Sequence, residues 1–409
     1  MRFLFVILQV RYPERNSMQK IIEEYIDSHR DEIIQKWREL VEIEAFWSET
    51  EYTREVAAYV KKLFEDAGCE CEIVDPDPSI PTPPVVTGVI GKDRPGTPIL
   101  FGGHYDTVFK RGFLKDHPFR IDENGHAYGP GVLDMKGGIV IAAYVIKALE
   151  AAGYNERPIR ISFCGDEEGG SNHGKVADVL AESGRGCEYA FNMETGIPKN
   201  NAICVGRKGA AAGKFIVHGV AAHSGNAFEA GRNAVIEAAH KMIEIDALTN
   251  METGTHMNVA MVKGGLVPNQ VPDVCEVTWM CRFRYNEEME KTIKAVDEIL
   301  AKTYIEGTTT ENIQLGGGKV FEDTPENNAL VDFIDKISQQ YGYGSVGRIF
   351  LGGGSDAPNF ARYGAITICA CGVLGEWNHT DREYAIVESM FTRAKMWGAV
   401  VTHLSEHKH

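Results

Sequence analysis

The segment Pro158-Ile-Arg-Ile-Ser-Phe-Cys164-Gly165 leads directly into three carboxylates, Asp166, Glu167 and Glu168, which Gly169-Gly170 follow. Its apolar and β-branched residues predict a buried strand that ends just before the acidic residues. Three adjacent carboxylates beside a buried strand repel one another strongly unless cations or protons neutralise them. The sequence therefore predicts a bound metal ion at this strand end.

Polar side chains also follow two other expected strands. The run 98–103 is apolar, and His104 and Asp106 come after it, on one face and two residues apart. A neutral imidazole that binds a metal needs an acceptor for its second nitrogen, and Asp106 is placed to be that acceptor. Glu194 follows the expected strand 189–193 in the same way.

Two further candidates come from a turn and from a late loop. The glycine-rich turn 129–138 places Asp134 just before an expected helix at 139–149. His379 lies in the loop after a buried run at 365–370. Because loops at strand ends of an open α/β sheet converge on one crevice, we expect all these side chains to meet there.

The candidate ligands are two imidazoles and three carboxylates: His104, Asp134, Glu168, Glu194 and His379. This mixed nitrogen and oxygen set suits zinc and is too large for one tetrahedral ion. Two ions roughly 3.5–4 Å apart that share one carboxylate would use all five. Glu167 is then left without a metal ion, which makes it the candidate general base for a metal-bound water.

The motifs around these residues resemble those of one enzyme family. In chain order they are Gly102–Val108, Tyr128–Gly138, Asp166–Ser171, Glu194-Thr195, Ala222–Gly225 and Gly352–Ala357. The ordered set is similar to the co-catalytic di-zinc metallopeptidases that include glutamate carboxypeptidase, aminoacylase, acetylornithine deacetylase and succinyl-diaminopimelate desuccinylase. The resemblance extends from about position 100 to His379, and it is closest to glutamate carboxypeptidase.

The resemblance implies roles for residues of this chain. One zinc ion would be held by His104, Asp134 and Glu194, and the other by Asp134, Glu168 and His379. Glu167 would be the general base and Asp106 the partner that orients His104. The bond between Asp134 and Met135 would match the family's cis peptide.

The resemblance also implies roles for residues near the substrate. His223 would polarise the scissile carbonyl, often in the neighbouring subunit's site, and losing such a donor costs roughly 3–4 kcal/mol of transition-state stabilisation. Asn269 would be a further polar donor, and Arg282 would clamp the substrate carboxylate with its planar guanidinium. Gly353 would line the pocket with backbone groups where a side chain would block close approach.

Hydrophobic periodicity predicts an α/β fold with an insertion. Helices are expected at 20–44 and 53–67, and strands then alternate with helices to about position 200, which is typical of a mainly parallel sheet with helices on both faces. Beyond position 206 the pattern predicts an α+β unit, with strands at 210–220, 255–262 and 274–285 and helices at 233–248 and 288–304. A final helix is expected at 383–403.

These patterns predict two domains. The first would be a discontinuous catalytic domain made of residues 1–206 and 318–409, with a zinc-peptidase-like fold. The second, residues 207–317, would be an inserted unit that the resemblance makes a ferredoxin-like lid and dimerisation domain. The resemblance thus implies a homodimer through the lid.

Composition restricts the class of partner. The chain has 409 residues and a net charge of −16, which argues against nucleic acid and acidic membranes because both require a basic surface. Nine cysteines without a Cys-x-x-Cys motif predict reduced thiols and a cytoplasmic location. The apolar run 3–10 is too short to span a membrane and lacks a cleavage site, so we expect residues 1–17 to be an upstream extension before Met18, with export as the alternative.

Together these observations predict a carboxypeptidase-like amidohydrolase with two zinc ions, or cobalt or manganese in their place. It would cleave a peptide or N-acyl bond next to a free carboxylate by a hydroxide held between the ions. An N-acyl-amino-acid deacylase or desuccinylase is the alternative, and a non-catalytic metal-binding relative is a third hypothesis. Gly129-Pro130-Gly131 lacks the third glycine of a dinucleotide fingerprint, which argues against nucleotide binding.

Overall fold

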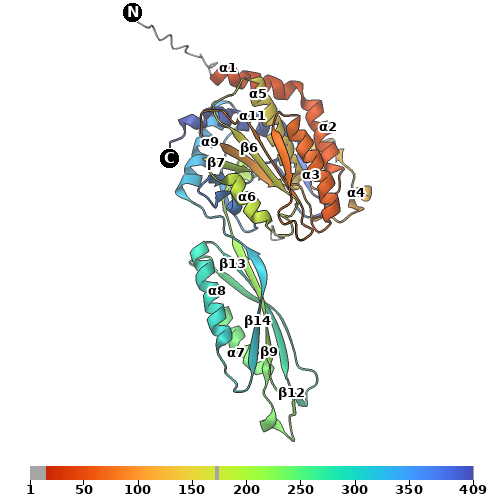
Figure 1. Ribbon diagram of the computed structural model, residues 1–409, viewed down its shortest axis with the longest axis vertical. Helices are drawn as coiled ribbons and strands as arrows, with labels where there is room; N and C mark the ends of the chain where they lie inside the picture. Colours follow the sequence, from red (N-terminus) through yellow and green to blue (C-terminus); the bar gives the residue numbers. More distant parts are fainter. Residues whose placement is uncertain (1–14, 171–174, 409) are drawn as a thin grey trace, which may run out of the picture.

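The computed structural model describes residues 15–170 and 175–408. The apolar run at residues 3–10, expected to belong to an upstream extension, lies outside the described residues. The chain forms a broad α/β part and a narrower unit that projects from one side of it (Figure 1).

The α/β part is built on a six-stranded sheet with the order β1-β2-β6-β3-β7-β16. The bounds are Glu70–Val74 (β1), Val85–Ile90 (β2), Ile99–His104 (β3), Ile159–Cys164 (β6), Tyr189–Asn192 (β7) and Ile366–Ile368 (β16). Strands β6, β3, β7 and β16 run parallel to one another, whereas β2 is antiparallel to both of its neighbours, β1 and β6. The predicted mainly parallel sheet is confirmed.

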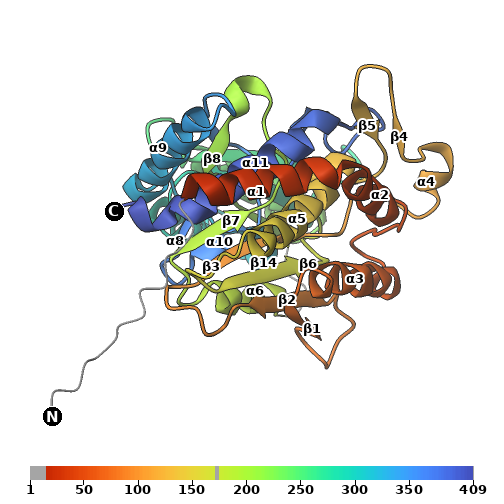
Figure 2. The same ribbon diagram turned by 90° about the horizontal axis from the view of Figure 1, so that it is seen from above.

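Helices cover both faces of this sheet (Figure 2). One face carries α1 (Arg15–Ser28), α2 (Arg30–Val41), α3 (Thr50–Glu65), α5 (Gly137–Ala151), α9 (Pro325–Gln340) and α11 (Val387–His403). The other carries α6 (Val176–Gly184) and α10 (Ala357–Ala361). Strand β3 shows the result: Phe101 packs into the first layer, Leu100 packs into the second, and all six residues of the strand are buried.

The parallel strands end at one edge of the sheet. The last residue of β3, His104, is in register with Cys164, the last residue of β6, and Gly102 is in register with Asn192, the last residue of β7. The segments that follow these strands therefore leave the sheet side by side, and they contain most of the candidate ligands.

Two small sheets support the remaining ligands. The first has the order β17-β18-β5-β4 and consists of Gly375–Glu376 (β17), Tyr384–Ile386 (β18), His126–Tyr128 (β5) and Arg120–Ile121 (β4), with α4 (Phe113–Asp116) before it. The second pairs β8 (Ile203–Arg207) with β15 (Arg348–Leu351) in parallel. Pairing of β5 with β18 places the loop that carries His379 beside the turn that carries Asp134.

The projecting unit is an antiparallel sheet with helices on one face. Its order is β11-β13-β9-β14, and its elements are β9 (Gly209–His218), α7 (Ala234–Asp246), β11 (His256–Gly264), β13 (Val274–Phe283), α8 (Asn286–Ala301) and β14 (Thr309–Gly318). Buried and partly exposed residues alternate along β9, as expected for a sheet with one covered face. This arrangement confirms the expected ferredoxin-like insertion. A short pair, β10 (Ala222–His223) and β12 (Gln270–Val271), lies at its far end (Figure 1).

Three local predictions were wrong. The helix expected at 20–44 is two helices, because His29 leaves the helical conformation and the chain turns there. The helix expected from position 383 begins at Val387, because the preceding residues form β18 and pair with β5. Strand β14 was not predicted, because its polar and glycine-rich sequence lacks alternation.

Two global features agree with the composition. Within residues 15–170 and 175–408, no helix has the length and apolar character needed to cross a bilayer. All nine cysteines fall in these ranges, and none forms a disulfide.

Candidate metal centre

Five side chains from distant parts of the chain converge at the sheet edge. The Nε2 atom of His104 lies 3.3 Å from Asp134 Oδ1 and 3.5 Å from Glu194 Oε1. The Nε2 atom of His379 lies 3.3 Å from Asp134 Oδ2 and 3.1 Å from Glu168 Oε2. Asp134 thus offers a different oxygen to each group, as a bridging ligand would.

The spacing of these atoms fits a tetrahedral ion. Zinc binds imidazole nitrogen and carboxylate oxygen at about 2.0–2.2 Å, so neighbouring ligand atoms on a tetrahedron lie about 3.3–3.5 Å apart. Three buried ligand atoms also have no hydrogen-bond partner among the described residues: His104 Nε2, Asp134 Oδ1 and Glu168 Oε1. Buried polar atoms without partners are costly and rare, and a bound cation would satisfy all three.

Asp106 holds two strand ends together. Its Oδ1 lies 3.3 Å from His104 Nδ1, on the side of the ring away from the ligand cluster. Its two oxygens also accept backbone N–H groups from Glu167 and Glu168, at 3.2 and 3.0 Å. One buried carboxylate therefore orients the imidazole at the end of β3 and fixes the acidic turn after β6.

The turn that carries Asp134 is fixed by residues that the sequence analysis missed. The Asp134–Met135 peptide bond is cis, as the resemblance implied. The buried Glu383 carboxylate accepts the N–H groups of Leu133 at 2.9 Å and Asp134 at 3.3 Å. Asn378 donates to Asp134 Oδ2 at 2.8 Å. Asn378 and Glu383 flank His379 in sequence, and an acid four residues after a candidate ligand was the signal that could have revealed Glu383.

Burial dominates the electrostatics of the centre. It raises the pKa of Glu167 well above its usual value, and the carboxylate of Glu194 adds to this effect. It also raises the pKa of Glu168 to about 7. Hydrogen bonding to Asp134 and Glu168 raises the pKa of His379 to about 11. The cluster carries more negative charge than its own imidazoles can balance, so it favours cations.

The expected substrate-binding residues fall into two groups. Arg282 and Gly353 line a cavity of about 1000 Å³ together with the ligand cluster. His223 and Asn269 are not among the residues lining it. His223 belongs to β10 and Asn269 directly precedes β12, at the far end of the inserted unit. Within this chain, therefore, the structure does not bring His223 and Asn269 to the cluster.

A family model agrees with the site. The model described as "Peptidase family M20/M25/M40" matches residues 100–403, about three quarters of the chain. The chain belongs to this family. The match includes every residue of the ligand cluster, and the M20 chain is a metal-dependent hydrolase.

Curated relatives and solved structures support this assignment. The chain is 28% identical over 320 residues to carboxypeptidase G2 of Pseudomonas sp. (strain RS-16), covering 78% of this chain and 76% of the relative. It is 27% identical over 360 residues to succinyl-diaminopimelate desuccinylase 2 of Ruegeria sp. (strain TM1040), covering 83% and 87%. The fold matches that of aminopeptidase PepT from Bacillus cereus with a TM-score of 0.74, at 21% identity over 92% of this chain and 99% of that one.

Replacing Glu383 tests how the Asp134 turn is held. We expect Glu383→Ala to lower the free energy of unfolding by about 2–4 kcal/mol, because two buried N–H groups lose their acceptor. Burial raises the pKa of Glu383 to about 8, so Glu383→Gln should resemble the wild type more closely. Urea denaturation of the three proteins measures this. An alanine variant as stable as the wild type would contradict the assigned role.

Proposed function

We propose that this M20 chain is a carboxypeptidase-like hydrolase that uses two zinc ions to cleave a peptide or N-acyl bond next to a free carboxylate. The observation that carries the proposal is the shared position of Asp134, whose two oxygens face two separate groups of ligands. Such sharing is typical of a two-metal site. Cobalt or manganese would fit the same donors.

Bound zinc would polarise the scissile carbonyl and lower the pKa of the attacking water. The protein's own part begins with Glu167, whose Oε2 lies 3.9 Å from His104 Nε2 and belongs to neither of the two groups that meet at Asp134. Because burial raises its pKa, Glu167 is suited to accept a proton from water and to return it to the departing amine. Asp106 keeps Glu167 in place by accepting a hydrogen bond from the backbone N–H of Glu167.

The position of Arg282 supports the proposal that the substrate carries a free carboxylate. The Arg282 side chain lines the same cavity as the ligand cluster and makes no hydrogen bond or ion pair within the described ranges. An unpaired guanidinium binds a carboxylate through two parallel hydrogen bonds. Backbone at Gly353 would lie against the same substrate, since that residue also lines the cavity.

Deacylation or desuccinylation of an N-acyl amino acid is the second candidate. Two desuccinylases, from Ruegeria and Rickettsia akari, are each 27% identical to this chain. The reaction uses the same residues and differs only in the acyl group. The third hypothesis, a non-catalytic relative, would require the loss of a ligand or of the base, and all six residues are present.

A homodimer through the inserted unit would complete the site. Edge strand β11 and the adjacent helix α7 expose apolar side chains: Ile236, Ile243, Met261 and Val262. An exposed apolar edge of this kind favours burial against a second copy. In such a dimer His223 and Asn269 of one subunit would reach the cavity of its partner, where His223 would donate to the scissile carbonyl. The unpaired thiols fit a cytoplasmic location.

Metal content tests the two-ion centre. We expect two zinc ions per wild-type chain, and activity that a chelator removes and that added zinc restores. Asp134→Ala should lower the affinity for both ions, because its carboxylate faces both groups, whereas Glu194→Ala should weaken only one. Inductively coupled plasma mass spectrometry with titration of the apoprotein measures this. One ion per chain in the wild type would contradict the proposal.

The role of Glu167 predicts a second result. We expect Glu167→Ala to lower kcat/KM by about 10²–10⁴-fold, which is the usual contribution of a positioned general base, while both ions stay bound. The assay is hydrolysis of a panel of dipeptides and N-acetyl and N-succinyl amino acids, followed by mass spectrometry. Glu287→Ala, an exposed acid on α8, is the control. Equal rates in Glu167→Ala and the wild type would disprove the mechanism.

Mixing two inactive variants tests the dimer. If His223 acts in the partner's site, a heterodimer of Glu167→Ala and His223→Ala has one intact site. Subunit exchange between the two variants should therefore recover about a quarter of wild-type activity. No recovery despite heterodimer formation, seen by native mass spectrometry, would mean that His223 does not act across the interface.

A further inference from the structure

Outside the ligand cluster, most of the charged side chains that line the cavity are cations. Apart from the cluster, one acidic residue that the structure describes lines the cavity: Asp297, which accepts a hydrogen bond from Asn312 at 2.8 Å. Its cationic side chains are Arg207, Lys208, Arg282, Lys319 and Arg362. In a chain with a net charge of −16, these five cations form a part of the cavity wall that favours anions.

Two of these cations have no partner of their own. The other three cations lie within hydrogen-bond distance of a partner: Arg207 of Gly354, Lys208 of His256, and Arg362 of Asp178. Arg282 and Lys319 form no side-chain hydrogen bond or ion pair with any residue that the structure describes. Arg282 is already proposed to bind the carboxylate next to the scissile bond. Lys319 therefore remains available for a second anionic group.

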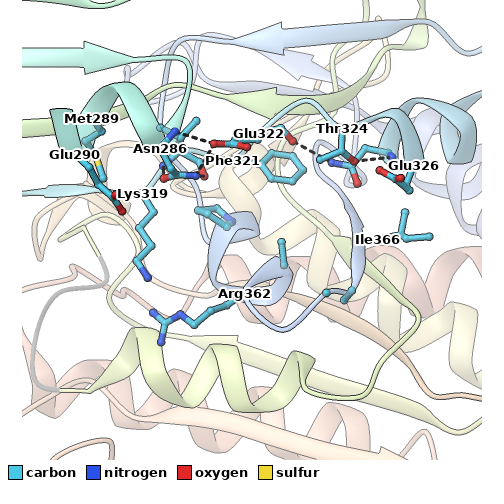
Figure 3. Close-up of a pocket in the computed structure, with 16 residues that line it drawn as sticks. Asn286, Met289, Glu290, Lys319, Phe321, Glu322, Thr324, Glu326, Arg362 and Ile366 are labelled. Atoms are coloured by element: carbon cyan, nitrogen blue, oxygen red, sulfur yellow. Dashed lines mark hydrogen bonds between the residues drawn. The ribbon is translucent and has the colours of Figure 1, made fainter. Parts of the chain in front are cut away.

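Lys319 faces another cation. Figure 3 shows its ammonium group directed toward the guanidinium of Arg362. Arg362 donates from Nη1 to Asp178 at 2.6 Å, but its Nε is buried and lacks a partner. Lys319 is exposed, so solvent reduces its repulsion with Arg362, but an anion between the two cations would be attracted by both. A buried N–H group without an acceptor is costly, and the same anion would accept from Arg362 Nε.

Lys319 and Arg362 lie where two cavities meet. A cavity of about 520 Å³ lies between the start of α8, the segment after β14 and α10 (Figure 3). Met289, Lys319, Pro358 and Arg362 line both this cavity and the larger one. Glu290, Glu322 and Glu326 also line the smaller cavity, but none forms an ion pair with Lys319, and Glu322 accepts hydrogen bonds from Asn286.

We propose that Lys319 and Arg362 form a second anion subsite, which binds a substrate carboxylate remote from the scissile bond. This inference rests on the proposed hydrolase function and extends it: the preferred substrates are amides with two carboxylates. Lys319 directly follows the last strand of the inserted unit, whereas Arg362 directly follows α10 in the α/β part. A carboxylate bound between them links the two parts and favours closure over the substrate.

Matched substrates test the subsite. Two pairs of dipeptides are compared: Glu-Ala with Gln-Ala, and Ala-Glu with Ala-Gln. Within each pair one side-chain carboxylate is replaced with an amide of the same shape. We expect the wild type to prefer the acid in at least one pair by about tenfold or more in kcat/KM, mainly through KM. Lys319→Ala and Arg362→Gln should lose this preference and keep the rate on the amide, whereas Lys319→Arg should retain it.

Lys294→Ala is the matched control, because Lys294 is an exposed lysine on α8 outside both cavities. It should behave as the wild type. Equal rates of the wild type on both members of each pair, or a preference that survives in Lys319→Ala and Arg362→Gln, overturns the proposal. Circular dichroism melting confirms that the variants are folded.

Failure of the hydrolase function would be seen separately. If the zinc-loaded wild type cleaves none of the peptides, calorimetry with glutarate, with butyrate as the monocarboxylate control, still tests the subsite. Binding of glutarate that Lys319→Ala loses supports it, and equal binding by both proteins overturns it. If inorganic phosphate binds in a Lys319-dependent way while acid and amide peptides react equally, the site takes a free anion and the assignment to substrate is wrong.

Discussion

Repulsion among buried carboxylates is the constraint on which this structure depends. Asp134, Glu167, Glu168 and Glu194 lie in one cluster with only two imidazoles, and burial makes their negative charge costly. The fold does not neutralise this charge but fixes the position of the charged side chains, through two further carboxylates that accept backbone N–H groups next to the cluster. Asp106 holds the Glu167–Glu168 turn, and Glu383 holds the backbone at Asp134. What remains unbalanced is charge that divalent cations would neutralise.

The same constraint explains why the parallel sheet and the inserted unit contribute different kinds of residue to the cavity. The parallel sheet supplies rigid strand ends, which hold the ligand atoms at the spacing of a coordination shell. The inserted unit and the segment that follows it supply the cations Arg282 and Lys319, which line the cavity. In the proposed function, anionic groups of a substrate would lie between the metal centre and these cations. The far end of the inserted unit, which carries His223, does not line the cavity.

Much of the fold and the centre was predictable because local signals were strong. The run ending at Cys164 and the glycine-flanked acids after it predict a strand and a metal ligand from residue type alone. The structure differs where tertiary pairing overrides periodicity. Residues 384–386 continue a helical pattern, yet they form β18 because β5 offers them a partner. Strand β14 has no alternation to detect. One of its glycines is required by close approach, since a Cβ on Gly317 would lie 2.1 Å from the carbonyl oxygen of Ala210.

The sequence by itself indicated which groups could bind metal and which acid is the candidate base, because motif spacing and residue chemistry are properties of the chain. Only the tertiary structure decided that Asp134 presents separate oxygens to two groups, that Glu383 and Asn378 position it, and that Lys319 faces Arg362. These relations join residues up to about 250 positions apart. Their geometry follows from how strands and loops pack in space, which no local pattern encodes.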